Sequence, residues 1–337
     1  MGETIERYCA SIKSVNSQNI CQKSNMVNKI NIDSITRAST KFDNIPNREW
    51  SVVEDVLSKE KVLIPSEMVY LNKTNYPPIR DIISTGLAAF STLQGAIIHG
   101  LCECIERDAF VLFWMLGYGR FKIDINTIEE IEIKILLNKA YHAGLKVDIY
   151  DISTEFDVPV ILTIIKKENS DGFYVACAAN FNYGKAIRKA LEEGLGGYSI
   201  YVEATLLHNI PIPDSLENPK DLSERPIYYL NNKKDYLLDS LIKCSGMLMN
   251  VKKYPSIEKE EPRLEQVINR IRERNINVFF KDLTTTDVRE IGFKVVRVIM
   301  PELAFLSTGS PMLHCERLTQ KSRELNRKIN MEPHPFP

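Results

Sequence analysis

Two acidic residues and an arginine stand inside the most apolar helix that the sequence predicts. Residues 92–117 carry apolar side chains at helical intervals, and Glu103, Glu106 and Arg107 share one face of that helix with His99. Charges beside so apolar a face are costly unless they are paired or bound to a charged ligand. Carboxylates hold Mg²⁺ and a guanidinium takes phosphate oxygens in a fork, so this group would suit a nucleoside triphosphate.

The same pattern occurs a second time near the N-terminus. Glu3, Glu6 and Arg7 repeat the Glu-x-Ile-Glu-Arg arrangement of residues 103–107. Two helices could therefore face each other with four carboxylates and two arginines between them, and Mg²⁺ would balance that charge. The alternative interpretation is that each copy is a common intrahelical salt-bridge pattern on a solvated face.

Proline alternates with other residues through the last segment, residues 330–337. Proline disfavours helix and sheet pairing and presets an extended polyproline conformation. We expect a stiff segment that could deliver the carboxylate of Pro337 to a defined place. A loosely held proline-rich end is the alternative.

Charge and hydropathy exclude several classes of protein. The 43 Lys and Arg residues nearly balance the 44 Asp and Glu residues, so no bulk positive field attracts nucleic acid. The longest unbroken apolar run, residues 109–116, is shorter than the roughly 18 residues that a membrane span requires. We find no signal-peptide core and expect a cytoplasmic protein that neither spans a membrane nor binds nucleic acid.

The seven cysteines show no CxxC spacing and are expected to be buried thiols.

Helix and strand patterns follow one another irregularly. Beyond the helix over 92–117, periodicity predicts helices over 128–143, 185–207, 236–249 and 264–274, and strands over 61–70, 146–152, 158–165, 174–179, 277–282 and 294–300. The sequence thus predicts an α+β fold in which a mixed or antiparallel sheet packs against long helices. Prolines and charges in residues 210–230 predict an excursion between a central α/β core over 61–209 and a C-terminal part over 231–337.

Four blocks of the sequence resemble the YcaO family. They are GETIERYCAS (2–11), STGLAAFSTLQGAIIHGLCECIERDA (84–109), KVVRVIMPEL (294–303) and NMEPHPFP (330–337). Around Arg107 and Trp114 the chain looks closest to the D-type component of azoline-forming cyclodehydratases. The resemblance covers nearly the whole chain, as one YcaO domain over 1–337. It implies an enzyme that depends on ATP and Mg²⁺ and acts on peptide amide bonds.

This resemblance leaves three hypotheses about activity. The first is the formation of thiazoline or oxazoline from Cys, Ser or Thr in a ribosomally made precursor peptide. The second is thioamide formation on a protein glycine with a TfuA-like partner. The third is a degenerate scaffold that binds a peptide or an active partner without turning over ATP. In each case a partner protein for substrate delivery is expected, and a homodimer is possible.

The resemblance also implies roles for individual residues. Glu3, Glu103 and Glu106 would hold Mg²⁺, and Pro337 would present its carboxylate as a general base for cyclisation. The residues implied in nucleotide binding are Glu3, Glu6, Arg7, Ser91, Gln94, Glu103, Glu106, Arg107 and Arg297.

Several positions depart from the family pattern. Phe90 and Ser91 stand where the family usually has Gly-Asn, and Gln94 and Gly95 stand where it commonly has a glutamate that binds the metal. A glutamine carbonyl can coordinate a hard cation but carries no negative charge. The first helix also begins at the start of the chain, so we expect residues 1–60 to be a shortened form of the family's N-terminal part.

Overall fold

The computed structural model describes residues 2–13, 27–37, 48–119, 121–168, 170, 172–216, 222–232, 234–242, 248–251, 261–307 and 314–336. The chain divides into two compact units. The first is Met1–Arg107 with Glu261–Ser307 and Met312–Gln320, and the second is Asp108–Glu260 with Thr308–Pro311 and Lys321–Pro337. Both units are discontinuous in sequence, so the continuous segments predicted above do not correspond to them one to one.

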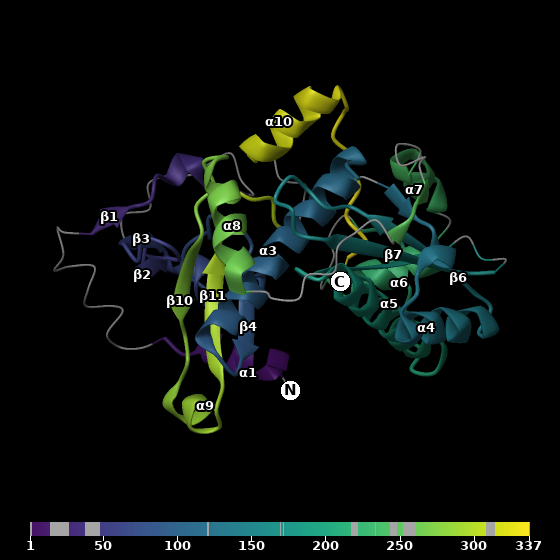
Figure 1. Cartoon of the computed structure of the whole chain (residues 1–337), viewed down its shortest axis with the longest axis horizontal. Helices are drawn as coiled ribbons and strands as arrows, with labels where there is room; N and C mark the ends of the chain where they lie inside the picture. Colours follow the sequence, from purple (N-terminus) through teal and green to yellow (C-terminus); the bar gives the residue numbers. More distant parts are fainter. Residues whose placement is uncertain are drawn as a thin grey trace. The chain divides into compact units, whose positions relative to one another are not determined.

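The first unit is built on a six-stranded sheet of order β1-β3-β2-β10-β11-β4 (Figure 1). All neighbours are antiparallel except β1 and β3. The strands are β1 (Asn28–Lys29), β2 (Trp50–Asp55), β3 (Lys61–Pro65), β4 (Leu87–Phe90), β10 (Phe279–Asp282) and β11 (Lys294–Ile299). The helices are α1 (Gly2–Ser11), α8 (Glu261–Arg272), α9 (Thr286–Glu290), the first half of α3 (Leu93–Leu116) and the start of α10 (Glu316–Leu325), with 3₁₀ turns η1 (Ile32–Ser34) and η2 (Ser66–Met68).

Two helices cover opposite faces of this sheet. Cys9 of α1 belongs to a buried apolar cluster with Val295 and Ile299 of β11. Successive side chains of a strand point to opposite faces, so Val298 of β11 lies on the other side, where it packs against Gly100 of α3. The apolar helix predicted over 92–117 is thus confirmed within one residue at each end, and the sheet separates it from α1.

Glycine permits the close approach of α3 to the sheet. A Cβ built on Gly86, whose φ is +85°, would lie 2.1 Å from the carbonyl oxygen of Val298. A Cβ on Gly100 would lie 2.7 Å from the carbonyl oxygen of Gly86. Gly86 therefore lets the chain before β4 approach the backbone of β11, and Gly100 lets α3 approach the backbone of Gly86.

We expect Gly86→Ala to destabilise the protein by about 3 kcal/mol, because left-handed strain adds to a clash with rigid backbone. Gly144→Ala is the matched control, because Gly144 also has a positive φ of +71° but nothing lies within 4 Å of its added Cβ. It should cost about 1 kcal/mol. Urea unfolding measures both, and equal losses would contradict the packing argument.

The second unit is built on a five-stranded sheet of order β8-β7-β6-β5-β9. Its strands are β5 (Phe121–Ile123), β6 (Leu145–Asp151), β7 (Val160–Lys167), β8 (Tyr174–Ala179) and β9 (Leu248–Met249), and its helices are α4 (Ile131–His142), α5 (Tyr183–Leu206), α6 (Glu224–Asn231), α7 (Asp235–Ile242) and the second half of α3, with the 3₁₀ turn η3 (Ile125–Thr127). Helices α4 and α5 pack against one face of the sheet through Ile133, Ile187 and Leu191. Two mixed sheets with long helices confirm the predicted α+β class.

Several local predictions need correction. The sequence analysis predicted no strand between residues 70 and 92, yet Leu87–Phe90 form the edge strand β4. The helix predicted over 236–249 ends at Ile242, and Leu248–Met249 pair with β5 instead. The predicted excursion over 210–230 ends in a packed helix, since Ile227 and Tyr229 of α6 are buried. Among the described residues, no helix is long and apolar enough to cross a membrane.

Candidate active site

The first Glu-x-x-Glu-Arg copy lies on α1. Two of its side chains are exposed to solvent and one contacts the sheet. Glu3 and Arg7 form an ion pair at 2.6 Å, and their side chains are 71% and 60% exposed. This part of the motif matches the alternative interpretation, an intrahelical pair on a solvated face. Glu6 behaves differently, because its Oε1 accepts a hydrogen bond of 2.8 Å from the backbone N–H of Ala89 in β4.

The second copy lies on α3 and is much less accessible. Glu106 is buried, and its Oε1 lies 3.7 Å from Nε of Arg107. Glu103 lies 3.6 Å from the same guanidinium, and its other oxygen accepts the N–H of Gly86 at 3.1 Å. The carboxylates and the guanidinium therefore compensate one another's charge near the middle of the helix.

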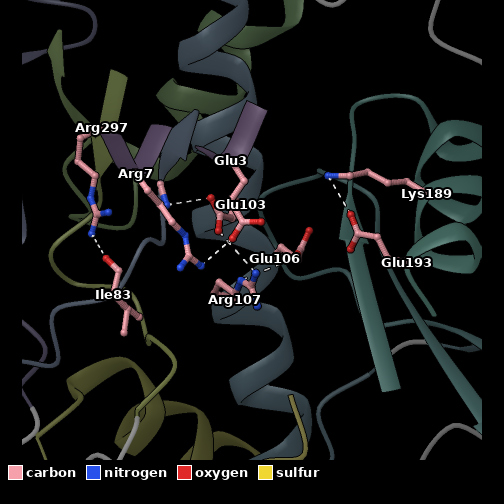
Figure 2. Close-up of polar contacts among 10 residues, drawn as sticks. Glu3, Arg7, Ile83, Glu103, Glu106, Arg107, Lys189, Glu193 and Arg297 are labelled. Atoms are coloured by element: carbon pink, nitrogen blue, oxygen red, sulfur yellow. Dashed lines mark hydrogen bonds and ion pairs between the residues drawn. The ribbon is translucent and has the colours of Figure 1, made fainter. Parts of the chain in front are cut away.

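The two copies meet at β4. Glu6 and Glu103 each bind a backbone N–H within residues 86–89, although their helices cover opposite faces of the sheet. Figure 2 draws Glu3 and Arg7 of α1 together with Glu103, Glu106 and Arg107 of α3. The edge strand supplies N–H groups that need acceptors, and glutamates from both helices provide them. Glu6 and Glu103 therefore approach the same short segment of the chain, whereas Glu3 is paired with Arg7 on the exposed side of α1. The predicted site with carboxylates of both helices facing each other stays a prediction.

Arg297 adds a buried cation from β11. Only 4% of its surface is exposed, and its Nη2 donates to the carbonyl oxygen of Ile83 at 2.7 Å (Figure 2). Its Nε and Nη1 are buried and have no hydrogen-bond partner among the described residues. Burial lowers the pKa of this guanidinium to about 10. Unpartnered buried donors on a cation are what the oxygens of a bound phosphate would satisfy.

The sequence analysis missed Arg80, which lies near Arg297. Its guanidinium lies over the ring of Phe305, 5.1 Å from the centroid. Burial and the charge of Arg297 together lower the pKa of Arg80 to about 10. The sequence does show Arg80 next to apolar residues, which can indicate a buried cation. A single basic residue in a loop has no repeated spacing, however, so the sequence analysis could not assign it to a site.

Ser91 and Gln94 flank the start of α3. Both side chains are exposed, and neither forms a hydrogen bond with another described residue. Between them, Thr92 accepts the N–H of Gly95 through Oγ1 at 3.1 Å and so caps the helix. The structure thus places both predicted residues at the solvent-accessible end of the helix that carries Glu103.

The proline-rich tail is docked within the second unit. The N–H of Asn330 donates to the carbonyl oxygen of Met115 at 2.7 Å. The indole Nε1 of Trp114 donates to the carbonyl oxygen of Glu332 at 2.8 Å. The tail therefore begins at the end of α3 in a defined position, and the loosely held alternative is wrong for its described residues.

Helix α6 and the ring of Phe110 hold the rest of the tail. Arg225, which is fully buried, contacts Nε2 of His334, and the hydroxyl of Tyr229 donates to the carbonyl oxygen of Pro333. The rings of Phe110 and Phe336 lie 4.8 Å apart. The predicted base, Pro337, lies outside the described residues, so its role stays a prediction.

Replacing Trp114 by Phe should loosen this tail. The change removes one buried N–H donor, a loss of about 1 kcal/mol, so amide hydrogen exchange at Asn330 and Glu332 should become about fivefold faster. Trp50→Phe, in β2 of the first unit, is the control and should leave both amides unchanged. Unaltered exchange in Trp114→Phe would show that the indole does not hold the tail.

The donor set fits a nucleotide better than a metal alone. Within the described ranges, no group of three or more His, Cys, Asp and Glu side chains is arranged to hold a metal ion. Mg²⁺ in nucleotide sites is usually bound by one or two carboxylates together with phosphates. Arg297 offers donors to the phosphates, and Glu103 and Glu106 offer carboxylates. A donor set of this kind, in an α+β protein, would suit a nucleotide bound together with Mg²⁺.

Comparison with known proteins identifies the family. A family model described as YcaO cyclodehydratase, ATP- and Mg²⁺-binding, matches residues 1–304. The chain therefore belongs to the YcaO family, which confirms the predicted fold, and ATP and Mg²⁺ are the cofactors of that family.

Individual relatives show how much of this chain, and how much of each known protein, the similarity covers. An uncharacterised protein in the tfuA 3′ region of Rhizobium leguminosarum bv. trifolii is 32% identical over 146 residues, 42% of this chain and 34% of the relative. A heterocyclase in complex with substrate and cofactor has a TM-score of 0.75 at 18% identity, covering 99% of this chain and 47% of its own. The YcaO protein of Methanopyrus kandleri bound with AMPPCP and Mg²⁺ has a TM-score of 0.66 at 16% identity, covering 100% of this chain and 79% of its own. The chain thus spans about a third of that curated relative and about half of that heterocyclase, and the solved structures show a shared fold.

Proposed function

We propose that this protein uses ATP to activate backbone amide oxygens of a ribosomally made peptide and so forms thiazoline or oxazoline rings. The observation that carries the proposal is the meeting of α1 and α3 at β4 beside Arg297, whose buried Nε and Nη1 lack partners among the described residues. The family membership and the docked proline-rich tail support the same reaction class.

In this reaction the Cys, Ser or Thr side chain of the peptide adds to the preceding carbonyl carbon. ATP supplies a phosphoryl group that makes the former amide oxygen a good leaving group. Departure of phosphate and loss of the amide proton leave a C=N bond in the new ring. The proton of the attacking thiol or hydroxyl must pass to a base, and the tail residue Pro337 is the proposed acceptor.

We assign roles to the site residues by charge and access. Arg107 and Arg297 would bind phosphate oxygens, because both are guanidiniums held beside or within the protein interior. Glu103 and Glu106 would share Mg²⁺ with those phosphates. Glu6 would fix α1 against β4. Glu3 and Arg7 would act at the rim as an exposed pair, and Ser91 and Gln94 would lie at the entrance.

A second candidate function is thioamide formation on a protein glycine. The Rhizobium relative from the tfuA 3′ region supports it, because a TfuA-like partner is what that reaction would need. The first step would differ only in the nucleophile, an external sulfide instead of a peptide side chain. Mass spectrometry of a treated peptide separates the two, since ring formation removes one water and thioamidation exchanges oxygen for sulfur.

Calorimetry with ATP tests the proposal directly. We expect ATP to bind and its affinity to rise with Mg²⁺, and we expect a candidate precursor peptide, with any delivery partner, to stimulate phosphate release. If the protein binds no nucleotide with or without Mg²⁺, it is a scaffold that binds a peptide or partner, and the proposal is wrong. Light scattering in the same samples reports whether the protein forms a homodimer.

A further inference from the structure

Exposed apolar side chains gather at the C-terminal end of α5 and in the loop that follows it. Five of the 17 exposed large apolar side chains of the described residues fall within residues 200–212. They are Ile200, Leu206, Leu207, Ile210 and Ile212, and each is between 43% and 73% exposed. We call these five residues the α5-end face. Single exposed apolar side chains are ordinary, but a group of them marks an interaction surface.

The backbone holds the members of this face close together. Ile200 and Leu207 are seven residues apart, which places them on one side of the helical segment. The N–H of Ile210 donates to the carbonyl oxygen of Ala204 at 3.2 Å. Asn209 has a positive φ of +50°, a left-handed conformation that ends a helix and turns the chain back. The loop is therefore folded against the last turn of α5, and Ile210 lies beside it.

The core of the second unit does not use the α5-end face. The inward side of the same part of α5 is formed by Tyr198 and Val202, which pack with Tyr174 and Ala176 of β8. The five residues of the face are absent from that cluster. The outward side of a surface helix normally carries polar residues. An apolar outward side at the end of α5 is therefore suited to being covered by another molecule.

Acidic residues border the α5-end face. Glu203 is 59% exposed, and Asp214, which follows the face, is exposed as well. Neither forms an ion pair with a described lysine or arginine, and Nε2 of His208 lies 4.0 Å from Glu203. Residues 190–219 hold five acidic residues and no lysine or arginine. The surface is thus apolar with a negative border.

This sign of charge distinguishes between the occupants that an exposed apolar surface can have. Anionic lipid and nucleic acid would be repelled by the carboxylates. A second copy in an isologous dimer would bring the same border against itself, so that carboxylates would meet carboxylates. A protein segment with apolar residues on one side and Lys or Arg on the other complements both the face and its border.

We propose that the α5-end face binds a basic amphipathic helix of a partner protein, the kind of partner that substrate delivery would require. The apolar side of that helix covers Leu206, Leu207 and Ile210, and its basic side chains reach Glu203 and Asp214. The inference goes beyond the proposed function, because it concerns assembly and holds for each candidate reaction.

A synthetic amphipathic helix of leucine and lysine is the probe that tests this surface on the full chain. Fluorescence anisotropy of the labelled peptide should show saturable binding that weakens as the salt concentration rises. A peptide with glutamate in place of every lysine should not bind. Leu206→Ser and Leu207→Ser should each weaken the lysine peptide about tenfold, as the loss of an apolar side chain in an interface does. Glu203→Gln should weaken it about threefold.

Ile131→Ser is the matched control, because Ile131 on α4 of the same unit is 73% exposed, as Leu206 is. It should leave the affinity for the lysine peptide unchanged. The thermal unfolding of all variants should stay close to that of the wild type, since exposed side chains contribute little to stability.

Three results would overturn the inference. They are equal binding of the glutamate peptide, normal binding of the lysine peptide by Leu206→Ser, and a dimer in light scattering that Leu207→Ser separates, because a second copy would then cover the face. Calorimetry of Leu206→Ser with ATP should match the wild type. It therefore reports the proposed function separately from the docking surface.

Discussion

Replacing Glu106 by Ala is expected to abolish detectable ATP binding, a loss of at least about 100-fold. Glu106 is buried on α3 and lies beside Arg107. Its removal takes away a proposed Mg²⁺ ligand and leaves the guanidinium without that neighbouring anion. Calorimetry with and without Mg²⁺ measures the effect, and most of the loss should appear in the Mg²⁺-dependent part of the affinity.

Two further variants make the Glu106 result interpretable. Glu106→Gln keeps the shape and removes only the charge, so it should lose Mg²⁺-dependent binding while its thermal unfolding stays close to that of the wild type. Glu193→Ala removes a carboxylate from the ion pair with Lys189, an exposed i,i+4 pair at 3.4 Å (Figure 2). This control should bind ATP normally. Unchanged affinity in Glu106→Ala would refute the site assignment.

Arg297→Met should change stability and binding in opposite directions. The arginine is buried, and two of its nitrogens lack partners among the described residues, so the ligand-free protein bears an uncompensated desolvation penalty. An apolar side chain of similar length should stabilise that state by about 1–3 kcal/mol. ATP affinity should fall about 100-fold, because a charged hydrogen-bonding partner of the phosphates is lost.

Urea unfolding and calorimetry on the same variant test both halves of this prediction. Arg289→Met, an exposed position on α9, is the control and should alter neither quantity. A variant that loses stability and binding together would indicate that Arg297 is an ordinary structural residue. Loss of stability without loss of ATP affinity would contradict its proposed role at the phosphates.

The pH dependence of stability and of ATP affinity provides a second test of the role of Arg297. Burial lowers the pKa of Arg297 to about 10, below the usual value of the unfolded chain, so the unfolded state binds more protons above that pH. The unfolding free energy of the ligand-free protein should therefore gain a rising component as pH increases through about 10. ATP affinity should decrease over the same range, because the neutral side chain no longer attracts phosphate. The rise in unfolding free energy and the fall in ATP affinity near pH 10 should both be smaller in Arg297→Met.

The helical elements were the most predictable part of the fold. The 24 residues of α3 carry apolar side chains at helical intervals throughout. The backbone hydrogen bonds of a helix join residues four apart in the sequence, so a long helix can be predicted from its own segment. Strands β7 and β8 were also predicted within two residues, because long β-branched or apolar runs between turn residues are unambiguous. The repeated Glu-x-x-Glu-Arg spacing likewise needed no tertiary information.

The strand β4 shows why the remainder was not predictable. Its four residues, Leu87–Phe90, include two alanines and show no convincing strand propensity. They are extended because they pair with β11, which lies about 200 residues later in the chain. Helix α6 was missed for a related reason, since its amphipathic pattern is short and follows several prolines.

The sequence by itself determined the long helices, the duplicated acidic motif and the family resemblance, because each depends on spacing within a continuous stretch. Only the tertiary structure decided that Glu6 rather than Glu3 reaches strand β4. It also decided that Arg297 is a buried cation with unpartnered nitrogens among the described residues, and that the ring of Phe90 occupies the space that a side chain at Gly95 would need. These features depend on long-range strand pairing and on the face of the sheet that each helix covers. Both are set by packing between distant segments, which local periodicity does not encode.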